Sequence, residues 1–346
     1  MSKDAKGRGR DRVRADTQIE PGPNPFFALA EKLCTPRVLH EVKPMRRPEG
    51  GAVRLALVSM PDVNYGHKPV KWRRKLPIGV KEDDLFRQVS KVSARDSKKM
   101  LGAFEEALRV ALEELGANVV CFNELGLPSH NAIPLAKAQN IASAMSEKHK
   151  ALIIAGTAHD SRTLFNTGYL FHPSNGEARW AFHKSASAWK MGERIMSPAR
   201  RRVLIVETFG LKIATMICLD VVDYTTLAAV MSAADRVEVL LVPCYTKRFE
   251  KMQDVATVAS RALPGVVALV NAQLPVGPRF IADCGKEVGL TEGPIRLASG
   301  AEIAMLSLKI DELQENRTRA KNELDGYLDW MFGNRYRPRE LQPWKA

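Results

Sequence analysis

The chain has 346 residues, of which 45% are hydrophobic and 26% charged, enough apolar sequence for one large domain or two ordinary ones. Its five cysteines are scattered, without a C-x-x-C pair or the Cys/His spacing of a zinc site, so neither a disulfide framework nor a structural metal is indicated. Because no apolar run approaches the roughly 18 residues of a membrane span and no signal-peptide pattern precedes residue 50, a reduced cytoplasmic protein without a membrane contact is expected.

The net charge of +13 is concentrated in two segments. Residues 1–14 have a net charge of +4 and residues 65–100 a net charge of +7, so the rest of the chain is nearly neutral. Such segments are either solvated or face an acidic partner. Since few aromatic side chains are interleaved there, we expect at most weak, non-specific contact of residues 65–100 with nucleic acid or another polyanion, weakening with salt.

The first half of the chain predicts alternating strands and helices after a basic, Pro-rich extension over residues 1–50, which begins as a disordered tail and ends as a linker. The apolar run VRLALVSM predicts a buried strand, and the basic segment after it predicts a long surface loop. Apolar residues then recur every three or four positions, which predicts a helix. The predicted elements are a strand at 53–60, a loop at 64–92, a helix at 97–117, a strand at 118–125 and a helix at 134–148.

The second half continues the alternation, with strand pairs between the helices. The predicted strands are 151–158, 164–172, 176–184, 203–210, 211–221, 237–245 and 265–273, and the predicted helices are 225–236 and 250–262. This order favours an α/β layered fold. We expect one domain over residues 51–312, followed by a C-terminal arm over residues 313–346 that is rich in aromatic residues.

Three polar residues each follow an apolar strand directly: Glu124 in VVCFNELG, Lys184 in WAFHKSA and Cys218 in TMICLDV. Ligands of open α/β sheets gather at strand ends. There a carboxylate can take the proton of a thiol, while an ammonium lowers the pKa of a thiol and stabilises oxyanion charge. Each residue taken singly also fits a structural reading, because buried cysteines usually pack in cores and charges at strand ends are usually solvated.

The order Glu124, Lys184, Cys218 with these local sequences resembles the carbon–nitrogen hydrolase (nitrilase) superfamily over residues 53–312. VRLALVSM is similar to the first strand of that family and CFNELGLP to the strand that delivers its glutamate. FHKSA and GLKIATMICLDVVDY are similar to its lysine and cysteine segments. The chain departs from the family at Asn123, where proline is usual, around Lys184, and in the Arg-Ala-x-Glu-Asn box, of which only the first two residues remain.

The resemblance implies an α-β-β-α sandwich of the nitrilase type that associates with a second copy into four stacked layers, so a homodimer or higher oligomer is expected. The C-terminal arm would dock on its own core or cross to the partner copy. No cofactor and no metal are implied.

The resemblance also assigns roles to individual residues. Cys218 would be the nucleophile and Glu124 the general base and acid. Lys184 and the backbone N–H of Leu219 would bind the oxyanion, and Glu193, the fourth catalytic residue, would orient Lys184 or the substrate. The expected contacts to substrate are Asn123, Asp220 and Tyr245.

The residues after the cysteine bear on the reaction class. Cys218-Leu219-Asp220 is similar to the amidase and carbamoylase branches, whereas nitrile hydrolysers of the family tend to carry Cys-Trp-Glu. The expected reaction is therefore hydrolysis of an amide or carbamoyl C–N bond of a small molecule through a Cys thioester. The alternative is a nitrilase-like module that mainly binds a partner or nucleic acid within a larger assembly, and a reactive Cys218 thiol would distinguish the two.

Overall fold

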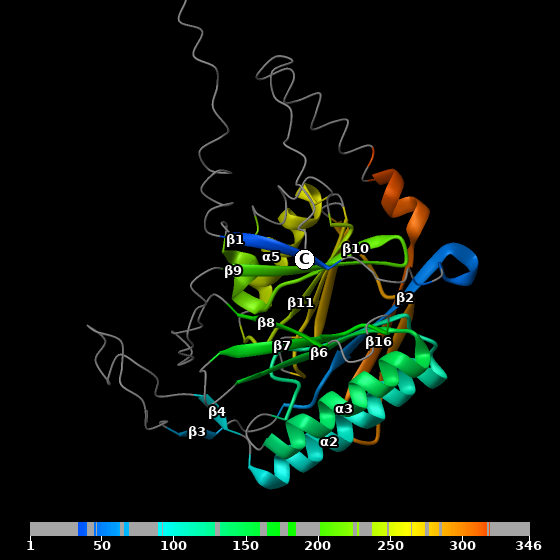
Figure 1. Ribbon diagram of the computed structural model, residues 1–346. Helices are drawn as coiled ribbons and strands as arrows, with labels where there is room; N and C mark the ends of the chain where they lie inside the picture. The colour runs from blue at the N-terminus through cyan, green and yellow to red at the C-terminus, as the bar shows by residue number, and fades with distance from the viewer. Residues whose placement is uncertain are drawn as a thin grey trace, which may run out of the picture.

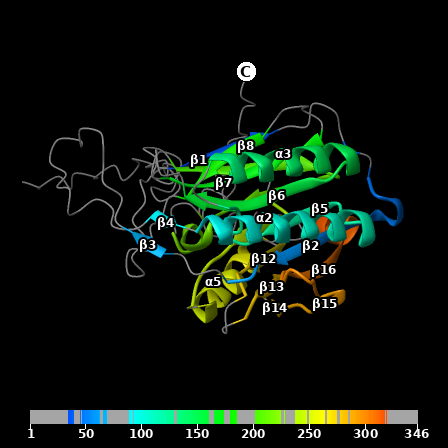
Figure 2. The same cartoon turned by 90° about the horizontal axis from the view of Figure 1, so that it is seen from below.

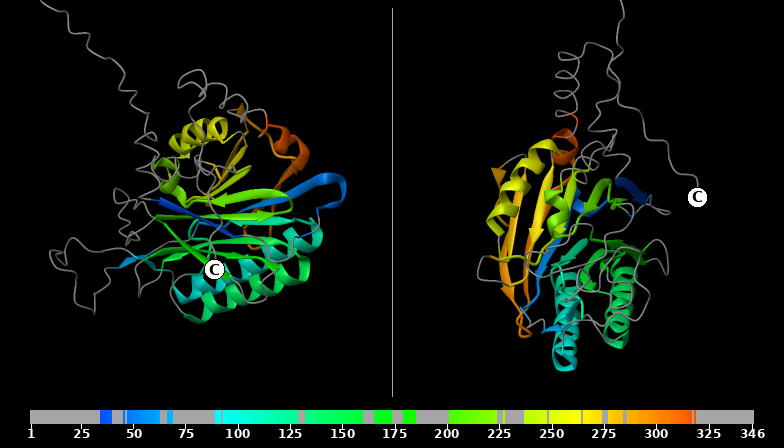
Figure 3. Two further views of the ribbon diagram at one scale, coloured as in Figure 1. Left: turned by 45° about the horizontal axis from the view of Figure 1, so that its top comes forward. Right: turned by 90° about the vertical axis from the view of Figure 1, so that its left-hand side faces the viewer.

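The computed structural model describes residues 34–39, 45, 47–62, 66–68, 89–91, 93–128, 132–159, 165–173, 179–184, 201–223, 227, 237–247, 249–263, 265–273, 277–283, 286–316 and 318. Two seven-stranded sheets lie face to face, and helices cover their outer faces (Figure 1, Figure 3). The predicted α-β-β-α sandwich is therefore confirmed.

The first sheet has the strand order β1-β9-β10-β11-β12-β13-β14. Its strands are β1 (Cys34–Leu39), β9 (Arg201–Thr208), β10 (Leu211–Thr215), β11 (Val239–Pro243), β12 (Val266–Val270), β13 (Arg279–Asp283) and β14 (Lys286–Glu287). Strands β10, β11 and β12 are parallel neighbours, and all residues of β11 and β12 are buried. Parallel strands covered on both faces read as continuous apolar runs, which is the pattern of VEVLLVP and GVVALV.

The second sheet has the strand order β15-β16-β2-β5-β6-β7-β8. Its strands are β15 (Glu292–Arg296), β16 (Glu302–Lys309), β2 (Ala52–Ser59), β5 (Val119–Phe122), β6 (Leu152–His159), β7 (Asn166–Phe171) and β8 (Arg179–His183). Strands β2, β5 and β6 form the parallel centre of this sheet. A separate short ladder joins β3 (Gly66–Lys68) to β4 (Val89–Lys91).

Helices α2 (Ala94–Arg109) and α3 (Ala132–His149) lie side by side on the outer face of the second sheet (Figure 2). The Ser93 hydroxyl caps α2 by accepting the Asp96 N–H at 3.0 Å. The apolar face of α2 packs on the sheet, with the ring of Phe104 4.6 Å from that of Phe122 in β5. The helix continues as a π-helical turn (Val110–Glu114) and ends near Gly116, whose φ of 61° favours glycine.

Helix α5 (Phe249–Ala262) covers the first sheet over β12 and β13. Within the described residues, short 3₁₀ turns span Glu49–Gly51 and Cys218–Val222, the second of which is labelled η5 below. The main apolar core lies between the sheets, where β2 and β5 meet β9, β10 and β11. Residues from Ile310 to Asn316 are helical, and Ile310 and Leu313 are buried in this core, so the start of the predicted C-terminal arm is packed against the domain.

The two sheets are also tied by polar contacts where β2 ends. Gln273 donates its backbone N–H to the Met60 carbonyl at 3.1 Å and its side-chain amide to the Ser59 carbonyl at 3.1 Å. The Ser59 hydroxyl in turn donates to the Pro278 carbonyl at 3.1 Å. These bonds fix the end of β2 against the other sheet, at the edge where the polar residues of the predicted site also lie.

Most predicted elements are confirmed within a few residues, with four differences. Strands β3 and β4 lie inside the segment predicted as a surface loop and pair with each other. Strand β1 lies inside the predicted linker and pairs in parallel with β9 as the edge strand of the first sheet. Its Pro36 lacks a backbone donor, which an edge position tolerates, and its short sequence CTPRVL gives no apolar alternation. The chain leaves β10 at Thr215, earlier than predicted. Strands β13 to β16 follow the last predicted strand. Residues 225–236, apart from Leu227, lie outside the described residues, as do most of 1–50, 64–92 and 317–346.

Candidate active site

The turn after β5 carries Glu124, and the side chain of Asn123 holds that turn. Asn123 Oδ1 accepts the backbone N–H of Met60 at 2.7 Å, and its Nδ2 donates to the Glu124 carbonyl at 2.7 Å. One buried amide thus ties the end of β2 to the turn. These two hydrogen bonds give Asn123 a structural role. A proline, which is usual at this position in the family that the sequence resembles, has no side-chain amide and could not make them. The substrate contact expected of Asn123 stays a prediction.

Strand β6 supports the other side of the same turn. Leu125 has a φ of 60° and donates its N–H to Thr157 Oγ1 at 2.9 Å. The pairing of β6 with β7 shifts register around Gly156, whose φ is 78°. A Cβ at Gly156 would lie 2.5 Å from the Asn123 carbonyl oxygen, so this close approach of two backbones requires glycine.

Replacing Gly156 by alanine is expected to destabilise the protein by about 2–4 kcal/mol, because the new Cβ meets a backbone oxygen and the residue keeps a left-handed conformation. The matched control is Gly102→Ala in α2, where a Cβ would meet nothing within 4 Å and helix propensity favours alanine by about 1 kcal/mol. Urea denaturation of both variants measures the difference. Equal stability of Gly156→Ala and the native protein would contradict the account of this turn.

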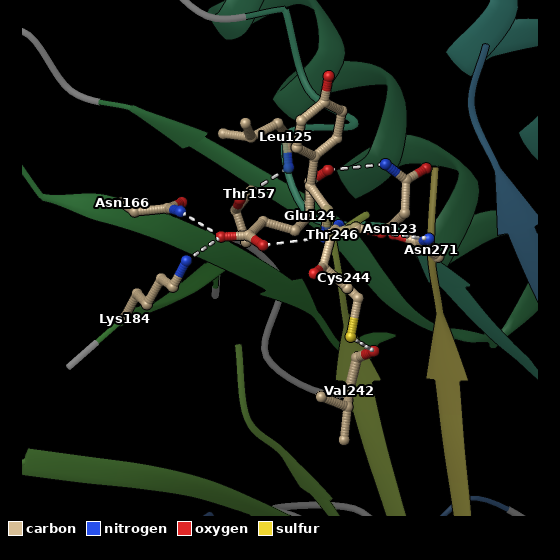
Figure 4. A network of polar contacts seen from close by, with 11 residues as sticks. Asn123, Glu124, Leu125, Thr157, Asn166, Lys184, Val242, Cys244, Thr246 and Asn271 are labelled. Atoms are coloured by element: carbon tan, nitrogen blue, oxygen red, sulfur yellow. Dashed lines mark hydrogen bonds and ion pairs between the residues drawn. The ribbon is translucent and has the colours of Figure 1, made fainter. Parts of the chain in front are cut away.

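The Glu124 carboxylate is held by three donors (Figure 4). Its Oε1 accepts from Lys184 Nζ at 2.6 Å and from Asn166 Nδ2 at 2.7 Å. Its Oε2 accepts the backbone N–H of Tyr245 at 3.0 Å. The side chains of Lys184 and Glu124 are 1% and 2% exposed, so this is a buried ion pair with charge-assisted hydrogen bonds.

Strand order explains why residues so distant in sequence meet here. Lys184 directly follows β8, and Asn166 is the first residue of β7. Because these strands are antiparallel, the end of one adjoins the start of the other, and the Lys184 N–H donates to the Asn166 carbonyl at 2.9 Å. Asn166 also pairs with His159 at the end of β6, the strand beside β5.

Cys218 is presented by a strained turn after β10. It is the first residue of η5, has a φ of 47° and is 2% exposed. A left-handed conformation costs a non-glycine residue about 1–2 kcal/mol and is typical of residues held in place for function. Among the described residues four non-glycine residues have positive φ, and two of them, Leu125 and Cys218, belong to this site.

Cys244 connects Cys218 to the buried ion pair. It follows β11, the strand that contacts both β5 and η5. Its thiol donates to the Val242 carbonyl at 3.3 Å and is hydrogen-bonded to the Cys218 side chain. Burial raises the pKa of the Cys244 thiol, and the hydrogen bond to Cys218 and the charges of Cys218 and Glu124 raise it further, against an opposing effect of Lys184. Glu124, Lys184 and Cys218 therefore converge around this thiol.

The other residues expected in the site lie on the same elements. Leu219 and the buried Asp220 are in the first turn of η5. Tyr245 is half-buried and donates its hydroxyl to Asp62 Oδ1 at 2.8 Å; burial, then this hydrogen bond, raises the pKa of its phenol. The roles assigned to these three residues stay predictions. Glu193 lies outside the described residues.

Sequence reasoning missed three residues that the structure adds to the site: Asn166, Thr157 and Cys244. Cys244 satisfies the rule that selected Cys218, because it too is a polar residue directly after an apolar strand. Asn166 opens a strand rather than closing one, and only antiparallel pairing brings it to the same edge. Thr157 lies within a strand, so no local pattern distinguishes it from a packing residue.

Alkylation with a limiting amount of reagent is expected to label Cys218 before the other described thiols. Burial raises the pKa of Cys121, and burial together with its charged neighbours raises that of Cys244, so both remain protonated at neutral pH. Alkylating reagents consume the thiolate. Peptide mass mapping over time gives the order, and labelling of Cys121 or Cys244 ahead of Cys218 would refute the assignment of the activated thiol.

In the part of the chain that the structure describes, no group of three or more His, Cys, Asp and Glu side chains is placed to hold a metal ion. Among the same residues, no helix is both long and apolar enough to cross a membrane.

No model of a protein family matches the sequence, and no curated protein matches it. Solved structures match its fold. A CN-hydrolase superfamily protein of Xanthomonas campestris has a TM-score of 0.52 at 16% identity and covers 80% of this chain and 97% of its own. A Saccharomyces cerevisiae member of branch 10 of the nitrilase superfamily has a TM-score of 0.54 at 15% identity, and the match covers 78% of this chain and 94% of the yeast chain. An amidase of Nesterenkonia sp. has a TM-score of 0.51 at 14% identity, and the match covers 80% of this chain and 98% of the amidase. The chain thus has the fold of the carbon–nitrogen hydrolase (nitrilase) superfamily, as the resemblance of its sequence implies.

Proposed function

We propose that this protein hydrolyses a C–N bond of a small amide or carbamoyl compound through a thioester on Cys218. The observation that carries the proposal is the buried Glu124–Lys184 pair, fixed by Asn166 and the Tyr245 N–H beside the thiols of Cys218 and Cys244. A buried charge pair costs desolvation and is weak evidence for stability, so its place beside a strained cysteine favours a chemical role. The shared fold with superfamily members, an amidase among them, supports the same reading.

In the first half of the reaction Glu124 accepts the Cys218 proton and the thiolate attacks the substrate carbonyl. The Lys184 ammonium and the Leu219 N–H then stabilise the negative charge on the carbonyl oxygen; removing one such donor typically costs about 100–1,000-fold in rate. When the tetrahedral intermediate collapses, Glu124 gives the proton to the nitrogen, which departs as ammonia or an amine. The C–N bond is broken and a C–S bond joins the acyl group to Cys218.

In the second half Glu124 takes a proton from water, and the resulting hydroxide attacks the thioester carbonyl. The same donors meet the second oxyanion. Its collapse breaks the C–S bond, the Cys218 sulfur regains a proton from Glu124, and the acid is released. Asn166 and the Tyr245 N–H keep the carboxylate oriented through both halves, because each holds one of its oxygens.

The local sequence Cys218-Leu219-Asp220 favours amide or carbamoyl substrates over nitriles. A screen for ammonia release over small primary amides and N-carbamoyl compounds tests this, with Cys218→Ala as the blank. Hydroxylamine added in parallel intercepts the thioester as a hydroxamate, which reports the acyl intermediate, while the free acid formed in water alone reports hydrolysis. We expect the native protein to release ammonia and to carry an acyl adduct on the Cys218 peptide, whereas Cys218→Ala should do neither. If neither ammonia nor an adduct forms with any compound, the proposal is wrong.

A further inference from the structure

One buried thiol of the site takes no part in the proposed hydrolysis. Cys244 is fully buried directly after β11, and η5, which begins with Cys218, contacts that strand. Because Thr215 of β10 pairs with Leu241 of the parallel strand β11, Cys218 and Cys244 each lie three residues beyond this pair, at the same edge of the sheet. The side-chain hydrogen bond to Cys218 is one of the causes that raise the pKa of the Cys244 thiol. The mechanism above needs only one sulfur. Cys121, Cys218 and Cys244 are all reduced, and of these three only the last two lie together.

We propose that Cys218 and Cys244 form a reversible oxidation site, in which Cys244 resolves a sulfenic acid on Cys218 into an intramolecular disulfide that blocks the nucleophile. The oxidant is a peroxide and the reductant a dithiol. The inference rests on the contact between the two thiols and does not depend on amide hydrolysis.

The two steps balance in atoms and electrons. The Cys218 thiolate attacks one oxygen of hydrogen peroxide, the O–O bond breaks, and Cys218 becomes a sulfenic acid while hydroxide leaves. The Cys244 sulfur then attacks the Cys218 sulfur, the S–O bond breaks, and the departing hydroxide leaves with the thiol proton as water. Two electrons pass from the two thiols to the peroxide. A dithiol returns them through a mixed disulfide and regenerates both thiols.

The surroundings of the two sulfurs make their roles unequal. Peroxide reacts with thiolates, and Cys244 remains a thiol while Cys218 and Glu124 carry negative charge, since both raise its pKa. Conversion of Cys218 to a neutral sulfenic acid removes one of those charges. Burial, which is the largest effect, and the charge of Glu124 still raise the pKa of Cys244 after this change, against the opposing effect of Lys184. Cys244 therefore stays a thiol in both states, and its proton leaves with the departing hydroxide when its sulfur attacks the sulfenic acid.

The test treats the folded, full-length protein with hydrogen peroxide and follows the covalent state of its cysteines by peptide mass mapping. In the native protein we expect a Cys218–Cys244 cross-linked peptide, reversed by dithiothreitol, with at least about tenfold less sulfinic acid at Cys218 than in Cys244→Ser. In that variant Cys218 should form a sulfenic acid that dimedone traps. Without dimedone, this sulfenic acid should oxidise irreversibly to sulfinic acid. Cys244→Ala serves if the serine variant fails to fold, which circular dichroism reports.

The matched control is Cys121→Ala, which removes a buried thiol on β5 and should leave the cross-link unchanged. Cys218→Ser should leave Cys244 reduced. A disulfide of Cys218 with any cysteine other than Cys244 would overturn the proposal, as would equal amounts of irreversible oxidation at Cys218 with and without Cys244. Because the readout is the covalent state of the sulfurs, its failure is separate from a failure to find an amide substrate.

Discussion

Cys218→Ala is expected to lower turnover of any substrate found for this protein by at least about 10⁴-fold, because the other thiol of the site, Cys244, stays protonated through burial and cannot replace the nucleophile. Cys218 lies on the turn after β10 with a φ of 47°, and alanine tolerates that conformation no worse than cysteine does. The fold should therefore persist. A discontinuous assay of product formation measures turnover, and thermal unfolding of the same variant measures its stability. Lost turnover with unchanged unfolding would show that the variant lacks the catalytic group and is still folded.

Two variants make this result specific. Cys121→Ala removes a thiol of equal burial on β5 and should retain turnover within a few-fold. Cys218→Gly should be at least as well folded as Cys218→Ala, since glycine relieves the left-handed strain of about 1–2 kcal/mol, yet remain inactive. Retained turnover in Cys218→Ala would remove the thioester from the mechanism.

Lys184→Met is expected to destabilise the protein by about 3–5 kcal/mol, because it leaves the Glu124 carboxylate buried without its partner charge. The two groups are 2.6 Å apart and almost wholly excluded from solvent. Asn166 and the Tyr245 N–H would remain as donors to the carboxylate, but neither carries a charge. Turnover should be lost as well, since Lys184 is also the proposed oxyanion donor. Urea denaturation and the ammonia assay measure the two effects.

A double-mutant cycle with Glu124→Gln identifies the cause. The double variant Glu124→Gln/Lys184→Met removes both charges together and should be more stable than the sum of the two single changes predicts, with a coupling energy of about 1–3 kcal/mol. Lys309→Met is the control, because Lys309 pairs with Glu312 at the same distance of 2.6 Å but on the surface. That exposed pair should contribute nothing measurable. Additive losses in the buried cycle would show that the pair is not coupled.

Part of the fold and of the site follows from local sequence. The runs of β2, β6, β11 and β12 are continuous and apolar, and strands buried on both faces have this pattern whatever surrounds them. Helix α2 is likewise encoded locally, because its apolar residues recur at helical spacing and its capping residue Ser93 directly precedes it. A polar residue after such a strand is visible without any structure, which is why Glu124, Lys184 and Cys218 could be selected.

The partners of these residues could not be selected, because they depend on contacts between distant segments. Glu124 and Lys184 are 60 residues apart and Glu124 and Tyr245 are 121 apart, and only the order and direction of the strands bring them together. Strand β1 has no apolar alternation, and its place is determined by pairing with the edge of β9. The close approach of Gly156 to Asn123 arises where two strands meet and leaves no periodic signal.

The sequence by itself thus determined the layered α/β fold, most of its strands and three chemical groups at strand ends, because burial and period are encoded locally. Only the tertiary structure decided that Asn123 holds the Glu124 turn, that Asn166 and the Tyr245 backbone orient the carboxylate, and that Cys244 lies against Cys218. Hydrogen bonds of this kind form between the ends of strands that are neighbours in space. Their distance along the chain is unrelated to any local pattern, so long-range strand pairing determines them.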